Sequence, residues 1–320
     1  MKLQKNDPPL VTVCALSYNT GGFTELAIRS AANSNYKNLE IICIDDGSTD
    51  SSASTLSHLA KELGFDFYVN IENKGIPASC NLGLSLATGE YFILIGDDIM
   101  LPNRIQGDVD MLNQNLEASF VCGSATIIGT DGLPMEKSSS WVSDVFEGPF
   151  TESPEEVWLH GSRIFTPTVT YRTQALRNLG GWDESYDVED RSMFIRFAKE
   201  RVSGWSRGEV TTLYRRHGGN YSAKFDIRMF QKELRLIEGF TLDIPAWRIS
   251  AKFLIAAHYW MLFLGARPSQ VAEALSLAGK RNLSWTTRSN LFKVAYLALT
   301  FVRKSRYVER NVRKYLLGND

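Results

Sequence analysis

The stretch of sequence from Leu39 to Asp50 is LEIICIDDGSTD, and it decides the fold class. Its first six residues, Leu39–Ile44, are mostly apolar, as is typical of a parallel strand whose two faces are both covered by helices. Asp45, Asp46 and Gly47 follow directly. We therefore expect a buried strand that delivers carboxylates to one edge of a sheet.

The same succession of apolar run, polar turn and helical segment recurs through the first hundred residues. The other expected strands are Leu10–Leu16, Phe65–Val69 and Tyr91–Ile95, and the expected helices are Phe23–Ala32, Asp50–Leu63 and Pro77–Ala87. Strands that alternate with helices form a parallel sheet through right-handed crossovers. The sequence therefore predicts a doubly wound α/β sheet, which binds ligands beyond the carboxyl ends of its strands.

Polar residues follow each expected strand at that edge. They are Ser17, Tyr18 and Asn19, then Asp45 and Asp46, then Asn70 and Asn73, and finally Gly96, Asp97 and Asp98. Neither a dinucleotide-binding nor a Walker-type glycine motif is present. The two acidic pairs would repel a bare diphosphate. They are compatible with a nucleotide if one pair hydrogen-bonds a base or ribose while the other holds a divalent cation that binds the diphosphate. Capping of the next helix is the alternative for each pair.

Charge is divided unequally along the 320 residues, although the whole chain carries a net charge of −1. From Arg248 to the end there are 13 Lys and Arg against 3 Asp and Glu, whereas residues 1–247 hold 22 basic and 33 acidic residues. A basic tail of this kind indicates an anionic partner, either a membrane or a nucleic acid. No nucleic-acid-binding module is recognisable, so we expect no nucleic acid partner.

The four cysteines, Cys14, Cys43, Cys80 and Cys122, lack the spacing of zinc ligands and are expected to be buried thiols in a reducing compartment. The first ten residues lack the apolar core of a signal peptide. The longest apolar stretch, Phe253–Ala266, is too short to span a bilayer. We expect a cytoplasmic protein, with a peripheral position at the inner face of the cell membrane as the alternative.

Taken together, these motifs resemble those of the nucleotide-sugar glycosyltransferases of family two, which have a GT-A fold. The matching elements span residues 10–105 and comprise SYN at 17–19, IDDGSTD at 44–50, NKGIPASCNLG at 73–83, GEY at 89–91 and GDD at 96–98. Two positions depart from the family pattern. Ile95, Gly96, Asp97 and Asp98 stand where members usually have Asp-x-Asp-Asp, so the first acid is missing, and Cys80 replaces an arginine.

The resemblance implies a site for a nucleotide sugar and a metal ion. The residues it assigns to the nucleotide sugar are Ser17, Tyr18, Asn19, Asp45, Asp46, Asn73, Gly75, Asn81, Asp97, Arg216 and His217. Mg²⁺ or Mn²⁺ would be held by Asp97, Asp98 and His217. Just past a strand end, Tyr18 is a candidate to stack on the nucleobase, with core packing as its alternative.

A weaker resemblance continues through the second half of the chain, over Thr168–Leu179, GGWDE at 180–184, the Glu189–Asp190 pair and YRRHGGN at 214–220. It implies that Asp190 is the catalytic base and that Trp182 and Glu189 lie at the acceptor or sugar pocket. Each of these residues also has a purely structural alternative role. Asp190 would favour the N-terminus of an expected helix, Asp190–Arg201, through the helix dipole alone. Trp182 could fill the core, and His217 could belong to a simple turn.

Three regions are expected. They are residues 1–105, a nucleotide-sugar-binding half, residues 106–225, the acceptor half of the same GT-A domain, and residues 226–320, a basic helical C-terminal region. Expected helices in the last are Asp226–Glu238, Ile249–Leu264, Pro268–Ala278 and Thr287–Leu317. Within residues 287–320 an apolar stretch leads into a basic one, a pattern that favours an anionic membrane interface. A packed helical subdomain with a solvated basic face is the alternative.

The resulting hypothesis is an inverting glycosyltransferase that moves a sugar from a nucleoside diphosphate, UDP above all, to a glycan or lipid-linked acceptor in cell-surface polysaccharide synthesis. Two other classes stay open. One is a nucleotide-sugar-binding scaffold without catalysis, motivated by the missing first acid. The other is a sugar-1-phosphate nucleotidyltransferase, which would carry an arginine in the glycine-rich loop after its first strand, whereas Ser17–Gly22 has none.

Overall fold

The computed structural model describes residues 7–135, 147–152, 157, 162, 164–186 and 189–220. The four helices expected after residue 225 and the basic segment at residues 287–320 lie outside the described residues.

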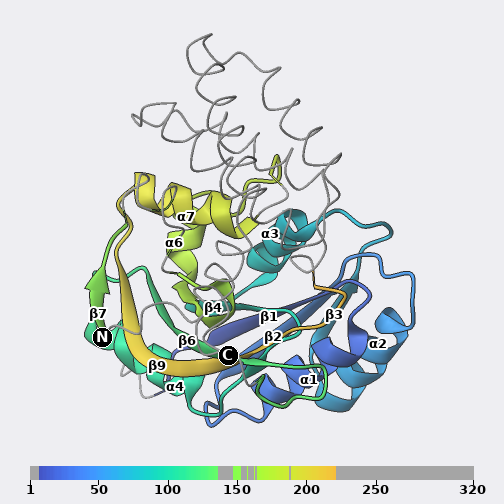
Figure 1. Ribbon diagram of the computed structural model, residues 1–320. Coiled ribbons are helices and arrows are strands. Elements are labelled where there is room, and N and C mark those ends of the chain that lie inside the picture. The colour runs from blue at the N-terminus through green and yellow to red at the C-terminus, as the bar shows by residue number, and fades with distance from the viewer. Residues whose placement is uncertain are drawn as a thin grey trace, which may run out of the picture. The chain divides into compact units, whose positions relative to one another are not determined.

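The first half of the chain forms the expected doubly wound sheet (Figure 1). Its strands β1 (Val11–Ser17), β2 (Leu39–Asp45), β3 (Asp66–Val69) and β4 (Tyr91–Ile95) are parallel and lie in the order β3-β2-β1-β4. The crossover helices are α1 (Gly21–Ala32), α2 (Ser52–Leu63) and α3 (Ile76–Leu86). In Figure 1, α1 and α2 lie below the sheet and α3 lies above it, so the apolar strands are covered on both faces.

Helix α3 is shifted by one residue from the expected range, and α1 and α2 begin two residues away from their expected starts, each beside a specific contact. Helix α2 begins at Ser52 and not at Asp50, because the Asp50 carboxylate accepts a hydrogen bond from the backbone N–H of Ser52 at 2.8 Å. Helix α1 begins at Gly21, two residues earlier than expected. Gly21 lies directly against α2, since a Cβ at this position would come within 2.5 Å of the Ser52 Cα.

The second half extends the same sheet. Its elements are β5 (Ile99–Met100), α4 (Arg104–Gln114), β6 (Phe120–Ile128), β7 (Glu147–Phe150), η1 (Thr166–Thr168), β8 (Thr170–Arg172), α6 (Thr173–Asn178), α7 (Glu189–Lys199) and β9 (Gly204–Arg215). Strand β8 is antiparallel to both β4 and β6, while β6 and β9 are parallel. The order continues as β4-β8-β6-β9-β5, with β7 added beside β9, so one sheet joins both halves.

The chain divides into two compact units. The first comprises residues 1–135, 141–157 and 162–216, and the second contains His217 and the residues after it together with two short segments. The four cysteines are buried and unbonded, as expected. Among the described residues, no helix is both long enough and apolar enough to cross a membrane.

Candidate functional site

The carboxyl ends of the parallel strands meet at one edge of the sheet. Strand register places Ser17 of β1 opposite Asp45 of β2, and Asp45 opposite Val69 of β3. The ladder continues one step further, because the N–H of Asp46 donates to the carbonyl of Ser17 and that of Asn70 to the carbonyl of Asp45, both at 2.8 Å. The predicted nucleotide residues of the first two strands are therefore neighbours in space.

Asp45 uses its carboxylate to shape its own turn. One oxygen accepts from the Ser48 N–H at 2.9 Å and the other from the Ser48 hydroxyl at 2.6 Å. Ser48 Oγ in turn accepts the N–H of Asn19, whose Oδ1 accepts the N–H of Thr49, both at 2.9 Å. Asn19 has a left-handed φ of 55°, so these bonds hold a strained residue in place. Asp45 and Asn19 thus join the loops after β1 and β2 to each other.

Asp46 holds the loop that follows β3. Its Oδ1 accepts from Asn70 Nδ2 at 2.7 Å and from the Lys74 N–H at 3.0 Å, while Oδ2 accepts the Gly75 N–H at 2.9 Å. Gly75 has a φ of 89°, a conformation that favours glycine. Asn73 lies exposed on this loop. A buried carboxylate with three donors is well satisfied, so Asp46 orients the loop on which Asn73 and Gly75 lie.

Ser17 and Tyr18 differ from their neighbours in what their side chains contact. Ser17 is 2% exposed, and its hydroxyl oxygen is buried without a hydrogen-bond partner among the described residues. Tyr18 is 46% exposed, so its ring does not pack in the core. A buried hydroxyl without a partner is costly, and an exposed ring at a strand end is available for stacking. The nucleotide-binding roles of both residues stay predictions.

The Asp97–Asp98 turn follows β4 at the same edge. Asp97 is half-buried and Asp98 is 6% exposed. The pKa of Asp98 is raised to about 8, chiefly by burial and then by the adjacent Asp97, while the Arg215 N–H and the charges of Arg104 and Arg215 oppose the rise. A Cβ on Gly96 would meet no atom within 4 Å, whereas Ile95, which stands in place of the first acid, is buried in the core.

This donor set fits a hard divalent cation. Mg²⁺ is usually held by one or two carboxylates and completes its coordination with water and substrate phosphate oxygens. A dication between Asp97 and Asp98 would offset the repulsion that raises the Asp98 pKa. No group of three or more His, Cys, Asp or Glu side chains with the spacing of a metal site occurs within the described part of the chain. The two-carboxylate turn is therefore compatible with a metal that shares its ligands with a phosphate.

Arg216 and His217 come immediately after β9. Arg216 is exposed, and its N–H donates to the carbonyl of Ile128 at 2.9 Å. His217 opens the second unit, in which its N–H donates to Asn220 Oδ1 at 2.5 Å and its Nδ1 accepts the Gly219 N–H at 3.0 Å. His217 therefore lies in a tight polar turn, and its metal and phosphate roles stay predictions.

Glu189 and Asp190 begin α7, one residue earlier than the helix expected from the sequence. Burial raises the pKa of Glu189 to about 8, and the neighbouring Asp190 adds to the rise. Glu189 also contributes to the raised pKa of Cys80 in α3, so the N-terminus of α7 lies close to that helix. Two adjacent carboxyl groups of this kind disfavour double ionisation, which is one way to obtain a proton acceptor near neutral pH.

Asn81 and Trp182 are joined to each other. The Asn81 amide donates to the Trp182 carbonyl at 2.8 Å and to Glu184 at 2.7 Å, and its oxygen accepts the Trp182 N–H at 2.8 Å. Trp182 is 3% exposed and its ring lies 6.0 Å from that of Phe92. The core-packing alternative thus describes this ring, and Asn81 ties α3 to the segment that leads into α7.

Comparison with known proteins agrees with this geometry. The family model described as Glycosyl transferase family 2 matches residues 12–180. An uncharacterised glycosyltransferase of Haemophilus influenzae is 38% identical over 224 residues, which cover 68% of this chain and 69% of that protein. The chain belongs to glycosyltransferase family 2. It spans only about 60% of the length of two Rickettsia members of the same kind.

Solved structures support the fold assignment. The Staphylococcus protein described as S. aureus TarS 1-349 in complex with UDP-GlcNAc has a TM-score of 0.60 and 16% identity, over 83% of this chain and 79% of that one. The mannosyltransferase PcManGT of Pyrobaculum calidifontis, in complex with GDP-Man and Mn²⁺, has a TM-score of 0.55 and 20% identity, over 92% and 81%. The fold of this family 2 member is accordingly of the GT-A type.

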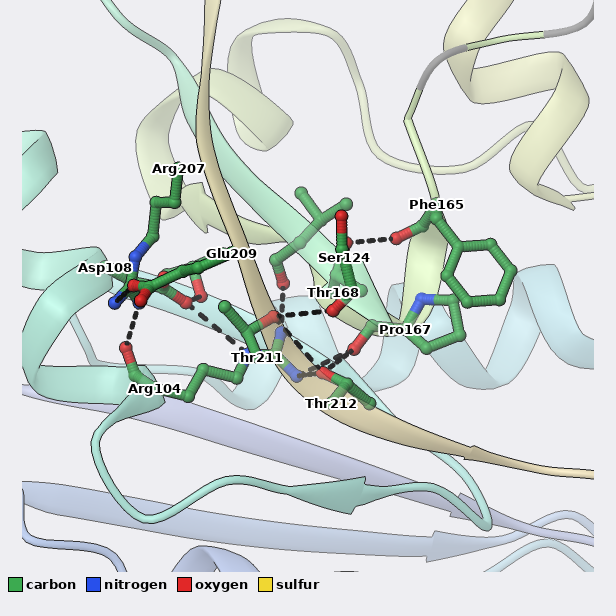
Figure 2. Close-up of polar contacts among 12 residues, drawn as sticks. Arg104, Asp108, Ser124, Phe165, Pro167, Thr168, Arg207, Glu209, Thr211 and Thr212 are labelled. Atoms are coloured by element: carbon green, nitrogen blue, oxygen red, sulfur yellow. Dashed lines mark hydrogen bonds and ion pairs between the residues drawn. The ribbon is translucent and has the colours of Figure 1, made fainter. Parts of the chain in front are cut away.

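The sequence did not reveal a buried ion network beneath the second half of the sheet (Figure 2). Arg104 in α4 is 1% exposed and donates to the carbonyls of Pro167 at 2.7 Å and Val169 at 3.0 Å. Asp108, one turn later, accepts from Arg207 of β9 at 2.7 Å. The spacing of Arg104 and Asp108, four residues apart, is that of an ion pair along a helix. Their other partners lie about 60 and 100 residues further along the chain and leave no local pattern. The network joins α4, η1 and β9 in this glycosyltransferase.

The contacts of Asp46 generate a prediction about stability. In Asp46→Asn an amide N–H₂ replaces one carboxylate oxygen, so at least one of the three donors to Asp46 loses its acceptor. We expect the free energy of unfolding to fall by about 1–3 kcal/mol, measured by urea denaturation. Asp50→Asn is the control, because it retains the oxygen that accepts the Ser52 N–H at an exposed position. Equal losses in both variants would contradict the structural role of Asp46.

Proposed function

We propose that this family 2 member is an inverting enzyme that transfers a sugar from a nucleoside diphosphate, UDP by preference, to a glycan or lipid-linked acceptor in cell-surface polysaccharide synthesis. One observation carries the proposal. The Ser17 hydroxyl, which has no hydrogen-bond partner in the described part of the chain, the exposed Tyr18 ring and the Asp97–Asp98 turn all lie at the carboxyl ends of parallel strands, at one sheet edge. A nucleoside diphosphate with a cation supplies a partner for each of them.

The donor would be bound in parts by different strand ends. The Tyr18 ring would stack on the base, and the loops shaped by Asp45, Asp46 and Asn19 would present Asn73 and Gly75 to the nucleoside. Asp97 and Asp98 would hold Mg²⁺ or Mn²⁺, which when bound neutralises charge on the leaving diphosphate. The exposed guanidinium of Arg216 would offset the same charge. The UDP-GlcNAc of the TarS structure and the GDP-Man and Mn²⁺ of PcManGT are donors and a metal of this kind.

Asp190 would act as the general base. In an inverting transfer the acceptor hydroxyl attacks the anomeric carbon from the face opposite the diphosphate and must lose its proton to a nearby acceptor. Glu189 beside it has a pKa raised by burial, so at neutral pH the pair shares less than two negative charges. Asp190, as the member of the pair assigned to the base, would accept the hydroxyl proton. Family membership disfavours the nucleotidyltransferase alternative.

The test of this assignment is Asp190→Asn. We expect turnover to fall by about 100-fold or more, because general-base catalysis contributes that much, while affinity for the donor nucleotide is unchanged. The donor is first found by a thermal-shift screen of nucleotide sugars with and without Mn²⁺, since a bound ligand raises the melting temperature. Release of nucleoside diphosphate then gives kcat, and titration calorimetry gives donor affinity. Glu200→Gln, at an exposed carboxylate after α7, is the matched control. Full activity in Asp190→Asn would rule out its role as the base.

We also propose that residues 287–320 contact an anionic membrane surface at the inner face of the cell membrane, where a lipid-linked acceptor would be found. The support is the sequence pattern of an apolar stretch followed by Lys and Arg, each worth about 1 kcal/mol near such a surface. Removal of these residues should release the protein from vesicles that contain anionic lipid, as followed by sedimentation. Undiminished vesicle binding by the shortened chain would contradict this proposal, and neutral vesicles provide the control.

A further inference from the structure

We propose that Arg215 is a positioning residue that holds the Asp97–Asp98 turn in the conformation that binds the divalent cation. This inference rests on the proposed function, because it concerns the metal site of the same donor pocket. It adds a residue that contacts both acids of the turn without itself being a ligand.

Arg215 contacts the two acids in two different ways. Its backbone N–H donates to Asp98 Oδ1 at 2.8 Å, which leaves the second carboxylate oxygen of Asp98 for another partner. Its Nε donates to the backbone carbonyl of Asp97 at 3.2 Å. The first contact sets the direction of a carboxylate, and the second sets the peptide plane between the two acids. One residue thereby determines how both side chains leave the turn.

The guanidinium is itself held on its other sides. Nη1 donates to the carbonyls of Gly129 at 3.1 Å and Thr130 at 3.3 Å, just after β6. The guanidinium carbon lies 5.0 Å from the centroid of the Phe23 ring in α1. Arg215 is only 3% exposed. The turn after β4 is therefore fastened through one planar group to the end of β6 and to the start of α1, as only an arginine fork allows.

Strand alternation separates the tasks of the two consecutive arginines. Arg215 is the last residue of β9 and points into the protein, whereas Arg216 is exposed. The exposed Arg216 is the one that the proposed function assigns to the phosphate, and Arg215 acts through the turn. Sequence reasoning assigned a role to Arg216 alone, because RRH contains no sign of which arginine faces inward.

The charge of Arg215 and its geometry have opposite effects on a cation. Positive charge near the turn stabilises the ionised acids when no metal is present, but it repels a dication. The directed hydrogen bonds pre-organise the ligands and so favour metal binding. Arg215→Lys keeps the charge and loses the planar fork. Arg215→Lys therefore tests the effect of the hydrogen-bond geometry at constant charge, whereas a neutral substitution would change both.

Arg172 offers a matched control at the opposite end of β4. It also donates to backbone carbonyls, those of Ala118 at 2.8 Å and Leu112 at 2.6 Å, and its guanidinium carbon lies 5.6 Å from the Tyr91 ring centroid. Strand register places it opposite Tyr91, the first residue of β4, whereas the turn follows the last. Arg172→Lys removes an equivalent clamp without touching the Asp97–Asp98 turn.

The experiment measures Mn²⁺ affinity directly, by the EPR signal of free Mn²⁺ during titration of the full chain in the presence of saturating UDP. We expect Arg215→Lys to weaken Mn²⁺ binding by about 10-fold or more, as is usual when a residue that orients a metal ligand is lost. UDP affinity without metal, measured by calorimetry, should change by less than about two-fold. Arg172→Lys should lower the melting temperature and leave Mn²⁺ affinity unchanged.

Equal Mn²⁺ affinity in wild type and Arg215→Lys would overturn the role of Arg215 and leave the proposed function standing. A wild-type protein that binds UDP but no Mn²⁺ would overturn the metal site and this inference with it. Phe23→Leu provides a second variant, because it removes the ring under the guanidinium and retains the strand-end bonds. If Arg215→Lys does not fold, weaker Mn²⁺ binding in Phe23→Leu supports the inference, and wild-type affinity there overturns it.

Discussion

A buried carboxylate must find hydrogen-bond donors, and this requirement organises the functional edge of the sheet. Asp46 finds its donors in the loop after β3, and Asp98 finds one in the last residue of β9. These partners are distant in sequence, between 24 and 117 residues away. The acids at the strand ends thereby bring together loops that apolar packing alone would leave independent. The layout of the site follows from satisfying them.

The same requirement divides the motif residues into two groups. Asp46, Asn19 and Asn81 use their polar atoms on backbone groups of neighbouring segments, and Asp45 uses its carboxylate on its own turn, so their main contribution is the shape of the site. Ser17 has a hydroxyl without a hydrogen-bond partner within the described ranges, and Tyr18 has an exposed ring. A motif that identifies a glycosyltransferase therefore consists largely of residues that build the pocket, with fewer that would contact the donor.

Much of the first half could be predicted from the sequence, because apolar runs of the right length mark the buried strands. The expected strands agree with β1 to β4 within one residue at each end. Helix starts were less predictable, since the start of α1 hydrogen-bonds Ser52 at the start of α2, and the N–H of Ser52 is bound by the Asp50 side chain. The location of the polar residues at one edge of the sheet was also predictable, because parallel strands have their carboxyl ends at the same edge. The buried position of Trp182 could not be predicted, because only the tertiary structure reveals that its ring packs against Phe92.

Arg215 and Arg104 could not be predicted, for a physical reason. Whether a residue of β9 faces inward depends on its register with β6, and that register shifts twice between Cys122 and Ala125. Arg104 is recognisable as buried only when Pro167, Val169 and Thr212 are known to surround it. Long-range pairing of this kind leaves no local pattern in one sequence.

The central claim is that one sheet edge binds a nucleoside diphosphate together with a divalent cation. Anomalous diffraction from crystals grown with UDP and Mn²⁺ tests it most directly. The account predicts a manganese peak beside Asp97 and Asp98, bridged to the diphosphate, with the uracil against Tyr18. A nucleotide bound elsewhere on the protein, or bound at this edge without manganese at the Asp97–Asp98 turn, would contradict it.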